Sequence, residues 1–101
     1  MSLIEKEGNR ARFSPAANIV AREVEVMRSA LNQLLAEGVA DLEIDLSHVR
    51  MIDSMGLGLI VTVHNSLKKI GGVFTVVHAS KELYNLFRSM RLTQHFSVSS
   101  D

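Results

Sequence analysis

The sequence has no cysteine and no tryptophan. The lack of cysteine excludes a disulfide framework, a thiol nucleophile and a cysteine-based zinc site. It also fits a reducing compartment, so we expect a cytoplasmic location. Neither sign of charge is in excess, because eleven basic and eleven acidic residues give a formal net charge of zero. No overall field draws such a chain to nucleic acid, and we expect no direct nucleic-acid partner.

Long hydrophobic runs are missing as well. The longest one, residues 55–61, includes two glycines and is far too short to cross a bilayer. The charged stretch 1–13 lacks the apolar centre that a signal peptide needs. We therefore expect no membrane insertion.

Apolar residues are plentiful, at 47% of the 101 residues, and can fill one modest core. We expect residues 1–101 to form a single domain. Helical periodicity predicts three helices, over residues 19–37, 54–70 and 81–90. Alternating or short apolar runs predict strands over residues 2–7, 11–14, 41–46 and 73–77.

The order of these segments predicts the fold. Residues 1–10 should supply an edge strand and a turn at Gly8-Asn9, and the small polar tail 97–101 should be frayed. Helices then alternate with strands at lengths that suit crossover connections. The result is an α/β fold, with a mostly parallel or mixed sheet of about four strands and helices packed on it.

Acidic and imidazole side chains offer little support for catalysis. Glu43 and Asp45 share one face of strand 41–46, but no third ligand or positioned nucleophile accompanies them, so we interpret them as structural. The histidines come from separate segments and lack the spacing of zinc enzymes; they are His48, His64, His78 and His95. We expect no enzyme, no metal site and no cofactor.

The most informative stretch joins strand 41–46 to helix 54–70. The period of the apolar residues changes near Asp53, which places Asp53 or Ser54 at the N-cap. A hydroxyl at this position lies next to unpaired N–H groups and the positive end of the helix dipole, a natural seat for a phosphate.

The surface beside this hydroxyl has two interpretations. Met55 and Leu59, with Val63 in the same row, are the best candidates for an exposed contact patch. The alternative is that the fold covers both faces of the helix. Gly56 and Gly58 either leave the backbone open to a partner or allow close helix packing.

The run Asp53-Ser54-Met55-Gly56-Leu57-Gly58 resembles the Asp-Ser-x-Gly-[Leu/Ile]-Gly motif of STAS-domain proteins, the bacterial anti-sigma factor antagonists. The resemblance continues through residues 65–67, the Gly71-Gly72 turn, strand 73–77 and helix 81–90. In that family a partner serine kinase phosphorylates the serine after the aspartate, which corresponds to Ser54. Asn18 is the nearest counterpart of a family aspartate, and the residue pattern itself favours a helix N-cap role for it.

The resemblance implies a phosphorylation-switched binding module. Its unphosphorylated form would bind a serine kinase or anti-sigma factor with an ATP-binding kinase fold, phosphate on Ser54 would weaken binding, and a phosphatase would reverse the modification. The chain would be a monomer or weak homodimer. The expected partner-binding residues are Asn18, Asp53, Met55, Gly56, Leu57, Gly58 and Leu59.

Two other functions fit the same resemblance. One is a STAS scaffold in a multiprotein signalling assembly, in which Ser54 is never phosphorylated. The other is a STAS subunit that handles a small molecule or a lipid. Phosphate on Ser54 in native cells would favour the switch, and a copurified ligand would favour the small-molecule function.

Overall fold

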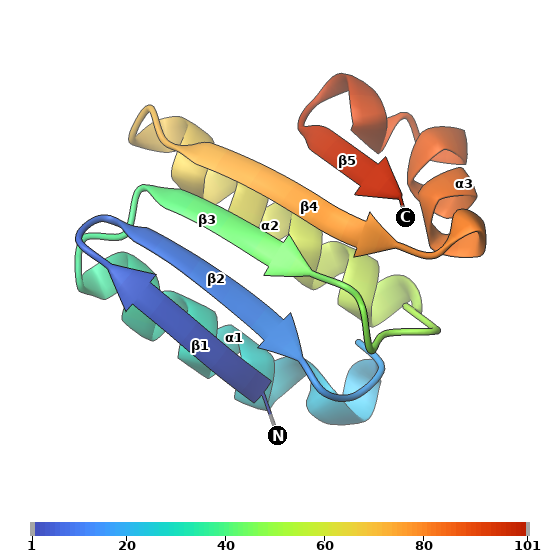
Figure 1. Ribbon diagram of the computed structural model, residues 1–101, viewed down its shortest axis with the longest axis horizontal. Helices are drawn as coiled ribbons and strands as arrows, with labels where there is room; N and C mark the ends of the chain where they lie inside the picture. The colour runs from blue at the N-terminus through green and yellow to red at the C-terminus, as the bar shows by residue number, and fades with distance from the viewer. Residues whose placement is uncertain (1, 101) are drawn as a thin grey trace.

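The structure, a computed structural model, describes residues 2–100 and contains one five-stranded sheet (Figure 1). The strands lie in the order β1-β2-β3-β4-β5, and β1 alone runs antiparallel to its neighbour. Along the chain the elements are β1 (Ser2–Glu7), β2 (Arg10–Pro15), α1 (Ala21–Ala36), β3 (Asp41–Asp45), α2 (Ser54–Lys69), β4 (Val73–Ala79), α3 (Lys81–Ser89), a 3-10 turn (Leu92–Gln94) and β5 (Ser97–Ser100). The predicted α/β class is confirmed, including the N-terminal hairpin.

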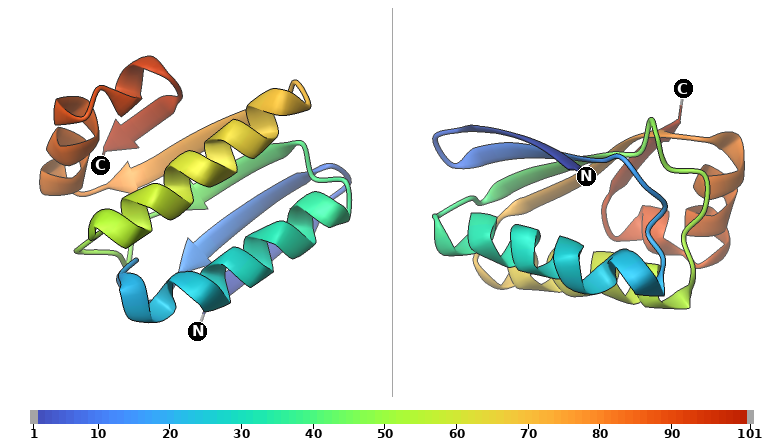
Figure 2. Two further views of the ribbon diagram at one scale, coloured as in Figure 1. Left: turned by 180° about the vertical axis from the view of Figure 1, so that it is seen from behind. Right: turned by 90° about the horizontal axis from the view of Figure 1, so that it is seen from below.

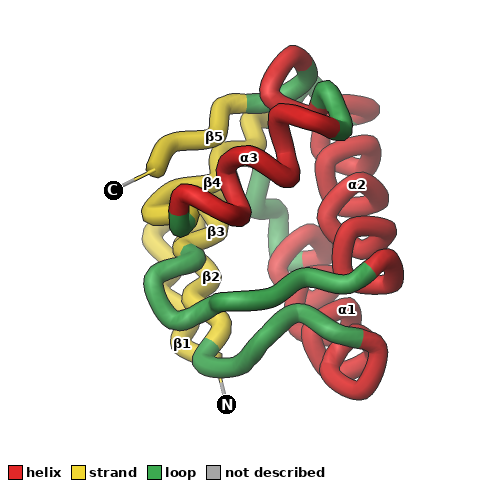
Figure 3. Tube along the Cα trace, turned by 90° about the vertical axis from the view of Figure 1, so that its right-hand side faces the viewer, coloured by secondary structure: helices red, strands yellow, loops and turns green. Residues whose placement is uncertain are grey.

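Helices α1 and α2 lie side by side on one face of the sheet, and α3 lies beside β4 and β5 (Figures 2 and 3). The core fills the space between the sheet and these helices. Its most deeply buried side chains include Phe13, Ile19, Val24, Leu31, Leu42, Ile44, Leu46, Ile60, Leu67, Val76 and Phe87. None of the helices within residues 2–100 is long and apolar enough to span a membrane.

The prediction of a frayed tail was wrong. Ser97–Ser100 forms β5, a fifth strand that pairs with the outer edge of β4, where Val98 lies opposite Val76. Small polar side chains make up most of this strand, so the sequence shows no alternation of apolar and polar residues there. The strand is held by backbone hydrogen bonds, which do not depend on the side chains. Asp101, the last residue of the predicted tail, lies outside the described residues.

Helix α3 begins as a capped helix should. The Ser80 hydroxyl accepts a hydrogen bond from the Leu83 N–H at 3.1 Å, and Leu83 and Phe87 are buried. Met90, three residues after Phe87, follows the end of the helix and is 55% exposed. The buried side of α3 therefore ends at Phe87.

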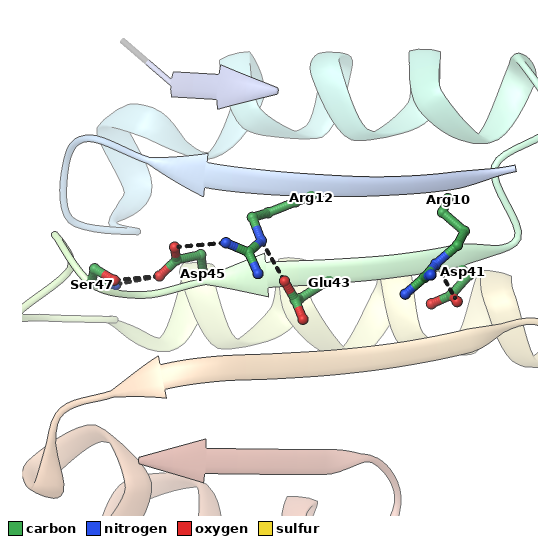
Figure 4. Close-up of polar contacts among 6 residues, drawn as sticks. All are labelled: Arg10, Arg12, Asp41, Glu43, Asp45 and Ser47. Carbon is green, nitrogen blue, oxygen red and sulfur yellow. Dashed lines mark hydrogen bonds and ion pairs between the residues drawn. The ribbon is translucent and has the colours of Figure 1, made fainter. Parts of the chain in front are cut away.

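The face of the sheet that α1 and α2 leave uncovered carries a ladder of ion pairs (Figure 4). Arg10 pairs with Asp41, and Arg12 pairs with both Glu43 and Asp45. Burial raises the pKa of Asp45, but hydrogen bonds from Ser47 and the charges of His78 and Arg12 outweigh it and lower the pKa. Glu43 and Asp45 thus pair with Arg12 on β2, and Asp45 also holds Ser47 at the start of the following loop.

Candidate functional site

The site lies at the N-terminus of α2, where the chain leaves β3 and the loop that follows it. Asp53 is the N-cap residue: its Oδ1 accepts a hydrogen bond from the Gly56 N–H at 2.9 Å, and its carbonyl oxygen accepts one from the Leu57 N–H at 2.9 Å. Ser54 is therefore the first residue of the helix, and it is exposed. The sequence left Asp53 and Ser54 as alternatives for the N-cap, and the structure assigns the cap to Asp53.

The Asp53 carboxylate also binds the start of α1. Its Oδ2 accepts a hydrogen bond from the Ala21 N–H at 2.9 Å. Val20, the N-cap residue of α1, has no side-chain acceptor to offer, so Asp53 replaces a local cap. Hydrogen bonds from the N–H groups of Gly56 and Ala21 lower the pKa of Asp53. At neutral pH a full negative charge thus stands beside Ser54.

Asn18 joins the two loops that lead into these helices. Its Oδ1 accepts hydrogen bonds from the Arg50 N–H at 2.8 Å and the Met51 N–H at 3.1 Å. The predicted N-cap role was therefore wrong, because α1 begins later, at Ala21. The signal for a loop-to-loop contact across about thirty residues is absent from any local pattern.

Ile19 strengthens the same junction through its backbone. Its N–H donates to the Met51 carbonyl at 3.1 Å, and its carbonyl accepts from the Asp53 N–H at 3.3 Å. Ile19 and Ile52 form a parallel bridge, and both side chains are buried. The loop that presents Ser54 is thus fixed to the segment after β2.

The two glycines of the motif have different surroundings. A Cβ on Gly56 would overlap the carbonyl oxygen of Ile19 and would lie 2.9 Å from Cγ2 of Ile52. A Cβ on Gly58 would meet no atom within 4 Å. Gly56 therefore allows close packing of α2 on the loop, whereas Gly58 leaves open backbone on the outer side of the helix.

The predicted contact patch was wrong in two of its three members. Met55 is 53% exposed, but Leu59 and Val63 are each only 3% exposed. Steps of four residues advance about 40° around a helix, so this row turns from solvent into the core.

The exposed side of α2 instead carries Ser54, Met55, Gly58 and Thr62, which we call the exposed row. Small and polar residues at intervals of four, from Ser54 to Gly58 to Thr62, were the sequence signal that could have identified it. The Thr62 hydroxyl is bonded to the Gly58 carbonyl at 2.8 Å.

The remaining predicted partner-binding residues divide by burial. Asn18, Asp53 and Leu57 are half-buried, whereas Gly56 and Leu59 are buried and support the site from inside. All of them except Asn18 lie at the cap or in the first two turns of α2, and Asn18 binds the loop that leads into the helix.

A groove of about 420 Å³ adjoins this junction, and sequence reasoning missed it. Its lining includes Asn18 and Met51 together with Arg22, His48 and Arg50, against a single acidic residue, Glu23. It lies beyond the carboxyl ends of the parallel strands β2 and β3, which is where open α/β sheets bind their ligands. Basic residues in the loops at these ends were the available signal.

Comparison with known proteins gives consistent matches over nearly the whole chain. The family model described as the STAS domain matches residues 3–101. The anti-sigma-B factor antagonist of Bacillus subtilis (strain 168) is 31% identical over 97 residues, which cover 96% of this chain and 88% of that protein.

Solved structures share the fold. An anti-sigma factor antagonist from Mycobacterium paratuberculosis has a TM-score of 0.86 at 23% identity, covering 100% of this chain and 86% of that chain. The Bacillus cell fate determinant SpoIIAA in its phosphorylated form has a TM-score of 0.80 at 16% identity, covering 100% and 92%.

Proposed function

Because this chain belongs to the STAS domain family, we propose that it is an anti-sigma factor antagonist controlled by phosphorylation of Ser54. In its unphosphorylated form it binds a serine kinase that acts as an anti-sigma factor. Phosphorylation by that kinase weakens binding, and a phosphatase restores it. The observation that carries the proposal is the exposed Ser54 at the first position of α2, beside the ionised Asp53.

The environment of Ser54 is compatible with a phosphate on the free protein. The first N–H groups of a helix and the positive end of its dipole favour an anion. Asp53 already occupies the Gly56 N–H, so the phosphate competes with a carboxylate for the same end of the helix. In water the repulsion between them is weak, and the fold is retained.

A bound partner changes this balance. A phosphoserine adds about −1.5 to −2 charges at neutral pH. When a partner covers the site, water is excluded and the repulsion between the phosphate and Asp53 increases severalfold. Phosphorylation therefore acts on the complex more than on the fold. SpoIIAA has been solved both in its unphosphorylated and in its phosphorylated form, which supports a switch of this kind.

The kinase contacts the exposed row together with Met51 in the loop before α2. Met51 and Met55 are each 53% exposed, and flexible methionine side chains adapt well to a partner. Gly58 lets a partner approach the backbone one turn further along α2. The basic groove beside Asn18 extends this surface toward α1.

A binding experiment tests the proposal. Wild-type, Ser54→Ala and Ser54→Asp proteins are used to capture partners from a lysate of the native cells, and the affinity of the captured kinase is then measured. Wild type and Ser54→Ala should bind alike, and Ser54→Asp should bind about tenfold more weakly or worse. Asn65→Asp, which adds the same charge at an exposed position further along α2, is the control and should bind like wild type.

Mass spectrometry of the protein from its native cells provides the second test. A phosphate on Ser54 is expected. If Ser54 stays unmodified and Ser54→Asp binds as tightly as wild type, the protein is an unswitched scaffold and the proposal is wrong.

A further inference from the structure

A second cavity lies at the C-terminal end of α2 and is lined by residues of α2, β4 and the start of β5. Figure 1 shows β5 running beside β4. The cavity is half open and about 460 Å³ in volume, which is in the range of small-molecule sites. His64 in its wall is ten residues after Ser54 on the same helix, a separation of about 15 Å along the axis. The cavity is therefore separate from the site described above.

Aromatic rings form the inner wall of this cavity. The rings of Phe74 and Phe96 meet edge to face with centroids 4.8 Å apart, and the His64 ring lies 5.1 Å from Phe96. Leu67 and Val73 complete the apolar part of the lining. Such a wall suits a flat or aliphatic group of a ligand.

The polar part of the lining combines one cation with two imidazole rings. Lys68 brings the charge, His64 and His95 bring ring nitrogens that can donate hydrogen bonds, and no carboxylate of residues 2–100 belongs to the lining. The His64 and His95 rings come from separate elements, and their centroids are 6.4 Å apart. Lys68 follows His64 by one helical turn on the same helix.

The carbonyl groups in the last turn of α2 lie at the same end of the helix as Lys68 and accept hydrogen bonds from the turn that follows the helix. The Leu67 carbonyl accepts hydrogen bonds from the N–H groups of Ile70 and Gly72, and the Lys68 carbonyl accepts one from Gly71. Burial, then the positive charges of Lys68 and His95, lower the pKa of His64. The side chains of His64, Lys68 and His95 therefore offer a negatively charged group of a ligand a favourable position.

We propose that this cavity binds a small organic carboxylate with an apolar body. The carboxylate accepts hydrogen bonds from His64, His95 and Lys68, and the apolar body lies against Phe74 and Phe96. A divalent cation is disfavoured because the Lys68 ammonium shares the lining, and within residues 2–100 no group of three metal-binding side chains exists. Nothing in this proposal depends on phosphorylation of Ser54.

Benzoate is a suitable probe because its charge stays constant between pH 6 and 8. Titration followed by amide NMR shifts at pH 6 should give saturable shifts at residues 64–75 and 95–97, with a dissociation constant of about 1 mM or below. Acetate, which lacks the apolar body, and benzyl alcohol, which lacks the charge, should each bind at least about tenfold more weakly.

Neighbouring lysines provide a matched pair of variants. Lys68→Gln should raise the dissociation constant of benzoate about tenfold, whereas Lys69→Gln, next along the helix but outside the lining, should change it less than twofold. Both positions are exposed, so both variants should fold. His64→Phe keeps an aromatic ring in the wall and should also weaken benzoate binding.

Three results would each overturn the proposal. The first is the absence of saturable shifts with benzoate at pH 6. The second is equal binding of benzyl alcohol and benzoate, which would make the cavity a purely apolar site. The third is an unchanged affinity for benzoate in both Lys68→Gln and His64→Phe, which would leave His64 with a packing role only.

Discussion

Gly56 and Gly58 stand two residues apart at the start of α2, yet they mark two different sides of the molecule. Gly56 faces inward, where the Ile19 backbone leaves no room for a Cβ, and Gly58 faces open space. Each costs about 1 kcal/mol of helix propensity relative to alanine. Contacts within the chain offset that cost at Gly56. At Gly58 no neighbouring atom of residues 2–100 does so, which is what we expect of a surface kept clear for a partner.

The residues that hold α2 in place thus differ from the residues that a partner can contact. On the inner side, Gly56, Leu59 and Val63 are buried and fix α2 against the rest of the fold. On the outer side, Ser54 and Gly58 are exposed. Substitutions on the inner side should therefore change stability first, and those on the outer side should change binding first.

The largest expected effect is on the inner side. Gly56→Ala places a methyl group against the Ile19 carbonyl, and because backbone cannot move aside cheaply, it should destabilise the fold by about 4 kcal/mol or more. Urea unfolding followed by circular dichroism measures this loss. Gly58→Ala is the matched control, and an equal loss of stability in both variants would contradict the comparison.

Asn18→Ala should have the next largest effect. It removes the acceptor of the Arg50 and Met51 N–H groups, and the expected loss is about 1–3 kcal/mol in the free energy of unfolding. Asn18→Asp keeps an oxygen at the same position and should lose less than about 0.5 kcal/mol. If the two variants were equally destabilised, the hydrogen bonds of Asn18 would not be what joins the loops.

These residues also show what the sequence can and cannot reveal. Periodicity predicts the α/β fold, the hairpin and the start of α2 at Ser54, because each of these depends on neighbours along the chain. Asn18 and Asp53 each use a side-chain oxygen to accept from the backbone N–H of a distant segment, and β5 pairs with β4 through backbone hydrogen bonds. Such contacts leave no trace in local spacing.

The predicted patch of Met55, Leu59 and Val63 failed for a different reason. The spacing of these residues is right for one row on an isolated helix, but the row drifts around the helix and meets the core after one turn. Choosing between an exposed and a buried apolar residue requires the positions of α1 and the sheet. A single helix cannot supply them.

Gly58→Ala should act in opposite directions on stability and on binding. The fold should gain up to about 1 kcal/mol, because alanine is the better helix former and its methyl group meets no atom. Affinity for the kinase should fall severalfold, because the methyl group stands between the partner and the backbone of α2. Denaturant unfolding and a binding titration measure the two quantities. A gain in stability with unchanged affinity would remove Gly58 from the proposed contact surface.

Asp53 lies between the buried and the exposed side of α2. Of the substitutions considered, that of Asp53 should have the smallest effect, and this effect should depend on pH. The pKa of Asp53 is lowered by the N–H groups of Gly56 and Ala21, so the stability that it contributes is complete above its ordinary pKa of 3.8 and is lost as the pH falls through the lowered value. Asp53→Asn keeps one acceptor oxygen and cannot serve both N–H groups. The urea midpoint of wild type should exceed that of Asp53→Asn at pH 7, and the difference should shrink steadily below pH 4.

A difference that stayed constant down to pH 2 would mean that shape, and not the charge of the carboxylate, holds the two helix starts together. Ser54 would then lie beside a group whose charge matters little to the fold, and the case for repulsion within the complex would have to be made from binding alone.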